Sequence, residues 1–129
     1  AGIFAAAQSA HGDAVGICLR AVGHKVMKAI RADISGKVAD SVARSTLDAW
    51  GFGKYFGHGL GHGVGLEIHE APSASPSSQY TLKEGMILTV EPGAYISGKY
   101  GVRTEDMVVV TNDGCRNLTN TTKDLIIID

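Results

Sequence analysis

The sequence has little net charge, few cysteines and no long apolar run. The formal net charge is -1, so there is no excess of Lys and Arg to attract nucleic acid or an anionic membrane surface. No apolar run approaches the roughly 18 residues that a membrane-spanning helix needs. Residues 1–10 lack the basic start of a signal peptide. These absences argue against nucleic-acid and membrane partners.

Cysteine is scarce as well. Cys18 and Cys115 lie far apart in the sequence. We interpret them as two reduced thiols of a cytoplasmic protein that pack as small buried hydrophobic residues, with one disulfide as the alternative. Hydrophobic residues make up 44% of the chain and charged residues 19%, which is typical of a soluble globular protein. The 129 residues suffice for a single domain with one core.

Two stretches of the chain have the apolar periodicity of a helix. Apolar residues recur at three- and four-residue steps over residues 15–30, where Gly16 and Gly23 predict a kink or a tight contact. A second helix is capped by Ser35 and ends at Gly51. Aromatic residues at its end are predicted to lie in the core; they are Trp50, Phe52, Tyr55 and Phe56.

The rest of the chain has the pattern of short strands. Residues 71–78 are predicted to form a loop because of their Pro and Ser content. Residues 97–99 predict a turn and residues 112–114 a hairpin. The predicted strands are residues 54–56, 86–91, 94–96, 102–104, 107–111 and 125–128. Two helices followed by antiparallel-looking strands indicate an α+β domain.

Glycine is abundant, and it occupies every second position from Gly57 to Gly65. In an extended backbone, the residues between, from His58 through His62 to Leu66, would share one face. The other face would be bare glycine, which weakens a strand unless another backbone or a ligand approaches closely. A flexible loop is the alternative, but histidines interleaved with aliphatic residues fit a loop poorly. We therefore predict a functional site here.

Three residues in or at the ends of predicted strands suit a metal ion: His62, Glu91 and Glu105. Glu91 ends an apolar run, so its carboxylate must be paired or metal-bound. The alternative for Glu105 is an ion pair with Arg103 or a solvated position. One imidazole with carboxylates suits manganese, cobalt, zinc or iron, and two carboxylates could bridge two metals. Imidazoles nearby could pass protons or hold a substrate.

Three motifs carry a resemblance to a known family: HGLGHGVGLEIHEAP, EGMILTVEPGAYI and GVRTEDMVVVT, in residues 58–72, 84–96 and 101–111. Together they resemble the C-terminal part of the Xaa-Pro peptidases, prolidase and aminopeptidase P. These enzymes share the pita-bread metallopeptidase fold with methionine aminopeptidase and creatinase. The resemblance covers about residues 25 to 129. It implies two helices packed on a mostly antiparallel curved sheet.

The resemblance also implies a role for each matching residue. His62 matches the histidine metal ligand, Glu91 a carboxylate ligand that could also act as the general base, and Glu105 the carboxylate that bridges two metals. His58 and His69 match the histidines that contact substrate or shuttle protons. Arg103 matches an arginine near the bound peptide. Manganese is the metal expected first.

One departure from the family concerns the remaining metal ligands. The family also uses two aspartates from an earlier segment, which no aspartate here matches; Asp13, Asp33, Asp40 and Asp48 fall in or beside the helices. Residues 1–129 therefore resemble the C-terminal portion of a catalytic domain without its aspartate-bearing half. We expect the chain alone to be weakly active or inactive, and two copies to pair as a homodimer that mimics the other half.

The resulting prediction is a metal-dependent exopeptidase that hydrolyses Xaa-Pro bonds in dipeptides or short peptides by metal-activated water. One alternative is a methionine aminopeptidase or a creatinase-like hydrolase, with the same fold and a different pocket. A second is a pita-bread domain that binds peptides or proteins without catalysis.

Overall fold

The computed structural model describes residues 4–5 and 10–124, with helices on one face of antiparallel strands. The helices are α1 (Ala10–Ala29), α2 (Gly36–Ala49) and the short 3-10 helix η1 (Gly53–Tyr55). The strands are β1 (Phe4–Ala5), β2 (Gly61–Gly63), β3 (Glu70–Ala74), β4 (Ile87–Val90), β5 (Gly93–Ile96), β6 (Tyr100–Arg103), β7 (Asp106–Val110) and β8 (Cys115–Asn117). In the part of the chain so described, no helix combines the length and apolar character needed to span a bilayer.

The described strands form two sheets, and neighbouring strands within each sheet are antiparallel. The larger sheet has the order β3-β2-β4-β7-β8, and the smaller has the order β1-β6-β5. Two short junctions connect the sheets, between β4 and β5 at residues 91–92 and between β6 and β7 at residues 104–105, besides the longer passage from β1 to β2 through the helices. The amide of Thr104 donates to the carbonyl of Pro92 across these two junctions, at 3.2 Å. The junctions therefore lie side by side.

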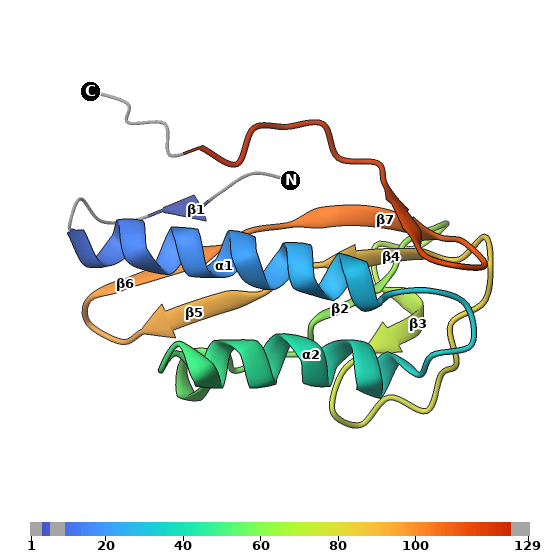
Figure 1. The fold of residues 1–129 in the computed structure, drawn as a ribbon, viewed down its shortest axis with the longest axis horizontal. Coiled ribbons are helices and arrows are strands. Elements are labelled where there is room, and N and C mark those ends of the chain that lie inside the picture. The colour runs from blue at the N-terminus through green and yellow to red at the C-terminus, as the bar shows by residue number, and fades with distance from the viewer. Residues whose placement is uncertain (1–3, 6–9, 125–129) are drawn as a thin grey trace.

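The core lies between the helices and the strands. In Figure 1 the two helices lie next to each other across one face of the strands, with α1 alongside β6 and α2 alongside β3. Most of the predicted stripe is buried without exposure, and Ala29 is its one partly exposed member. The fully buried residues are Val15, Cys18, Leu19, Val22, Val26 and Ile30. They meet Leu88, Val90, Val108 and Val110 from the sheet in one cluster. Each such side chain contributes about 1.5–3 kcal/mol on burial, so this face determines where the helices dock.

The helix boundaries confirm most of the end signals. Ser35 caps α2, with its Oγ accepting a hydrogen bond from the Val38 amide at 3.2 Å. The helix ends before Gly51, whose φ of +80° is the left-handed conformation that glycine adopts freely. The tight contact predicted at Gly16 and Gly23 is wrong, because α1 continues through both and an added Cβ would meet no atom within 4 Å.

Three other local predictions are wrong. Residues 54–56 were predicted as a strand, but η1 ends at Tyr55 because the chain is still turning out of α2. Trp50 is 49% exposed rather than buried, since it lies on the helix end that faces solvent. The aromatic residues that follow it do pack in or against the core, as predicted.

The loop predicted at residues 71–78 is also partly a strand. Pro and Ser favour loops by local preference, but β3 pairs with β2 through its backbone, which needs no particular side chain. Pro72 is tolerated because β3 is the edge strand of its sheet. The strands predicted near 86–91, 94–96, 102–104 and 107–111 agree with β4 to β7, and both predicted turns are present. Strand β8, which follows the hairpin turn, was not predicted. The strand predicted at 125–128 lies outside the described residues.

Candidate active site

The glycines of β2 allow it to lie tightly between two neighbouring strands. A Cβ on Gly61 would overlap the carbonyl oxygen of Thr89 in β4, and one on Gly63 would overlap that of Ala71 in β3. The predicted close approach of another backbone is therefore confirmed. A single continuous face is wrong, however, because the strand ends at Gly63 after a register shift, and Leu66 is fully exposed.

This packing brings His62 against Glu91. The Nε2 atom of His62 lies 3.1 Å from Oε1 of Glu91, which is only 8% exposed. On the other side of the ring, Nδ1 lies 2.9 Å from the carbonyl oxygen of Gly63. A carbonyl can only accept, so this bond places the hydrogen on Nδ1. Nε2 then points its lone pair at a carboxylate, and a cation, either a proton or a metal ion, must join the two.

Thr89 connects the same two residues through its hydroxyl. Its Oγ1 accepts a hydrogen bond from the His62 amide at 3.0 Å and donates one to Glu91 Oε1 at 2.8 Å. Thr89 was not among the site residues predicted from the sequence. The available signal was a polar residue inside an apolar strand, two positions before Glu91 and therefore on the same face of an extended chain.

Arg103 joins Glu91 to Glu105. Its Nη1 lies 3.6 Å from Glu91 Oε2 and its Nη2 lies 3.7 Å from Glu105 Oε2. The two carboxylates come from the two adjacent junctions between the sheets, which is why residues distant in sequence meet here. The alternative kept open for Glu105, an ion pair with Arg103, is confirmed. Its role as a metal ligand stays a prediction.

The two other predicted histidines lie in different surroundings. The ring of His69 is 4.2 Å from the ring of His62, between centroids, and is exposed. His58 donates from Nδ1 to the carbonyl of its neighbour Gly59 at 2.7 Å. Its Nε2 therefore accepts from the Tyr95 hydroxyl, 2.9 Å away. Tyr95 is thus part of the site, held by the histidine that the sequence singled out.

These residues fit part of a metal site and not a complete one. The free lone pair of His62 facing Glu91 is the arrangement a cation needs, and imidazole with carboxylate is a suitable donor set. Glu105 contacts Arg103. Among residues 14–124, no three His, Cys, Asp or Glu side chains are grouped so that they could hold a metal ion.

Comparison with known proteins gives consistent matches. Residues 3–112 match metallopeptidase family M24. The chain is 48% identical over 99 residues to the uncharacterised peptidase YqhT of Bacillus subtilis, covering 77% of this chain and 28% of that protein. It is 45% identical over 102 residues to the Xaa-Pro dipeptidase of Pyrococcus horikoshii, covering 79% and 29%. The chain thus spans less than a third of the length of these curated relatives.

The fold matches as well. The crystal structure of an X-Pro aminopeptidase from Thermotoga maritima superposes with a TM-score of 0.89 at 38% identity, covering 93% of this chain and 34% of that one. The prediction of two helices on a mostly antiparallel sheet, as in the C-terminal part of a pita-bread domain, is confirmed.

Proposed function

The chain belongs to metallopeptidase family M24, and from this membership we propose that it supplies the histidine–glutamate part of a site that hydrolyses Xaa-Pro bonds in dipeptides or short peptides. The observation that carries the proposal is the contact between His62 Nε2 and Glu91 Oε1 at 3.1 Å, with Arg103 and Glu105 beside it. Its identity to Xaa-Pro dipeptidases supports the choice of substrate. We place the protein in the cytoplasm, with its two thiols reduced.

The site residues divide into donors and substrate contacts. His62 and Glu91 act as donors to a divalent cation, with manganese first and cobalt, zinc or iron as alternatives. Glu105 would be the third donor, as the family resemblance implies. A divalent cation in such a site supplies an acidic water and polarises a carbonyl. The donors that complete the set are the two aspartates implied by the family resemblance, which this chain does not match.

The remaining residues bind the peptide. His58 and His69 offer ring nitrogens to a peptide carbonyl or carboxylate and can exchange a proton with it. Arg103 carries a fork of donors suited to a carboxylate, such as the C-terminus of a dipeptide. Glu91 is the proposed proton acceptor, because Thr89 bonds only its Oε1 and leaves Oε2 to accept a proton.

The test combines metal binding with hydrolysis. The purified chain is titrated with Mn²⁺, and turnover of an Xaa-Pro dipeptide is compared with that of the matching Xaa-Ala dipeptide. We expect weak binding of one ion, lost in His62→Ala and Glu91→Gln, and slow turnover restricted to Xaa-Pro. Val38→Ala, on the exposed side of α2, is the matched control. Equal turnover of both peptides, or metal binding that survives both site variants, would contradict the proposal.

A further inference from the structure

One ion pair of α2 contacts the backbone that carries His58. Asp40 and Arg44 lie four residues apart on α2, with Arg44 Nε donating to Asp40 Oδ2 at 2.7 Å and Nη2 to Oδ1 at 3.2 Å. The Asp40 side chain is 1% exposed and that of Arg44 is 30% exposed. A buried carboxylate needs such a partner, because desolvation of an isolated charge is costly. The pair is therefore fixed in place.

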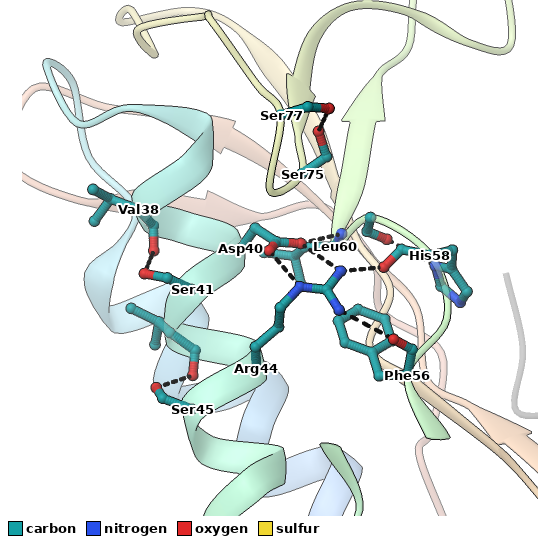
Figure 2. Close-up of polar contacts among 12 residues, drawn as sticks. Val38, Asp40, Ser41, Arg44, Ser45, Phe56, His58, Leu60, Ser75 and Ser77 are labelled. Carbon is teal, nitrogen blue, oxygen red and sulfur yellow. Dashed lines mark hydrogen bonds and ion pairs between the residues drawn. The ribbon is translucent and has the colours of Figure 1, made fainter. Parts of the chain in front are cut away.

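The same two side chains also bond the backbone of residues 56–60, the segment that leads into β2. Arg44 Nη1 donates to the carbonyl of Phe56 at 3.1 Å, and Nη2 donates to the carbonyl of His58. Asp40 Oδ1 accepts from the amide of Leu60 at 3.0 Å. Figure 2 shows the guanidinium of Arg44 between Asp40 and this segment, with dashed lines to both carbonyls. The guanidinium carbon also lies 4.6 Å from the centroid of the Phe56 ring.

These three backbone groups belong to residues 56, 58 and 60, at every second position. Alternate residues of an extended chain direct their backbone groups to the same side, where a neighbouring strand normally pairs with them. None of residues 56–60 lies in a strand. The segment bends at His58 and Leu60, and the Asp40–Arg44 pair takes the place of that neighbour by bonding these backbone groups.

The pair reaches the catalytic groups by two routes. The first is the backbone of His58, whose ring accepts from Tyr95 at 2.9 Å. The second is Leu60, which donates its amide to Asp40 and accepts the amide of Glu91 on its carbonyl at 2.9 Å. We propose that Arg44 and Asp40 are positioning residues. They set the orientation of the His58 ring and, through Leu60, the position of the Glu91 backbone. That these residues position catalytic groups rests on the proposed function. The hydrogen bonds of Asp40 and Arg44 to residues 56, 58 and 60 do not depend on it.

The test is Arg44→Lys, which keeps a charge beside Asp40 but loses the fork that spans both carbonyls. Amide exchange and the ring resonances of the histidines are measured by NMR on the full chain. We expect the Leu60 amide to exchange at least about tenfold faster, and the His58 ring signals to shift. The amides of β4 and β7 and the ring of His24, exposed on α1, should be unchanged.

The matched control is Arg20→Lys. Arg20 also donates to a distant backbone carbonyl, that of Lys123 at 2.8 Å, but far from this segment. It should leave Leu60 and His58 unchanged. If exchange in Arg44→Lys accelerates equally at all amides, the pair contributes only to overall stability and the proposal is overturned. If exchange at the Leu60 amide does not change, the pair does not hold this segment and the proposal is also overturned.

Two further readouts keep the test decisive. If Arg44→Lys does not fold, a through-hydrogen-bond coupling between the Leu60 amide nitrogen and the Asp40 carboxyl carbon is sought in the unaltered chain; its absence overturns the proposal, and its presence supports it. Mn²⁺ binding to the unaltered chain is measured in parallel. A local NMR change in Arg44→Lys with no Mn²⁺ binding to the unaltered chain leaves the positioning standing and rejects the proposed function, whereas Mn²⁺ binding without the NMR change rejects the positioning alone.

Discussion

At the scale of single residues, the site depends on small groups in crowded places. Thr89 is 3% exposed and bonds both the His62 amide and Glu91. It can occupy that place only because Gly61 has no side chain. The distance between the imidazole and the carboxylate is thus determined by a hydroxyl and by a missing Cβ, neither of which carries charge.

This predicts that Gly61→Ala is destabilising. Its Cβ would overlap the Thr89 carbonyl, which is backbone and cannot rotate away, so we expect the free energy of unfolding to fall by about 3 kcal/mol. Gly57→Ala is the matched control, because an added Cβ there meets nothing within 4 Å; its effect should stay below about 0.5 kcal/mol. Urea unfolding measures both. Equal effects of the two would show that β2 can shift away from β4.

At the scale of elements, α2 links the core to the site. One face buries Ala39, Ala43 and Leu47, while Asp40 and Arg44 hold the segment before β2. The start of this helix is defined by Ser35, which also bridges to Thr81. A helix that frays at its first turn would loosen Asp40, which lies one turn further on.

We therefore predict that Ser35→Ala lowers the free energy of unfolding by about 1 kcal/mol, because the Val38 amide loses its side-chain acceptor and keeps only the Ser35 carbonyl. Ser41→Ala, on the exposed side of the same helix, should be neutral or slightly stabilising, since alanine is the better helix former. Thermal unfolding of the two variants against the unaltered chain measures the difference. A loss in Ser41→Ala as large as in Ser35→Ala would argue against a capping role.

At the scale of the whole molecule, the core holds a titratable group. Cys18 is fully buried in the stripe of α1, and burial raises the pKa of its thiol from the ordinary 9.0 to about 11. Burial also raises the pKa of the half-buried Cys115. Both are free thiols, as the sequence predicted. In the unfolded chain each thiol ionises at its ordinary pKa, so folding is linked to pH.

The sign of this linkage is definite. Between pH 9 and 11 the folded state keeps the Cys18 proton while the unfolded state releases it, so the free energy of unfolding falls as pH rises. Below pH 9 both states are protonated and Cys18 adds no slope. Urea unfolding from pH 8 to 11 should show this decline, and Cys18→Ala should decline less steeply. Identical slopes would mean that the Cys18 thiol ionises at the same pH in the folded and the unfolded state.

The sequence by itself determined much of this protein. The helical stripe, the cap at Ser35, the strands around Glu91 and the glycine–histidine run followed from local periodicity and backbone freedom, and the motifs led to the family. The same local signals misplaced β3, because strand pairing depends on a partner and not on Pro and Ser content. Residues 125–128 lie outside the described residues, so the strand predicted there stays a prediction.

Only the tertiary structure decided which groups meet. The ion pair of Arg103 with Glu105 was an alternative that the sequence offered, but Arg103 also contacts Glu91 because two junctions between the sheets are adjacent, which local pattern does not indicate. In the sequence, nothing distinguishes Arg44 from other residues of its helix. Its bonds to the Phe56 and His58 carbonyls exist only because α2 packs beside that segment. Periodicity specifies which face of an element is buried, whereas the contacts of charged side chains depend on how separate elements pack against one another.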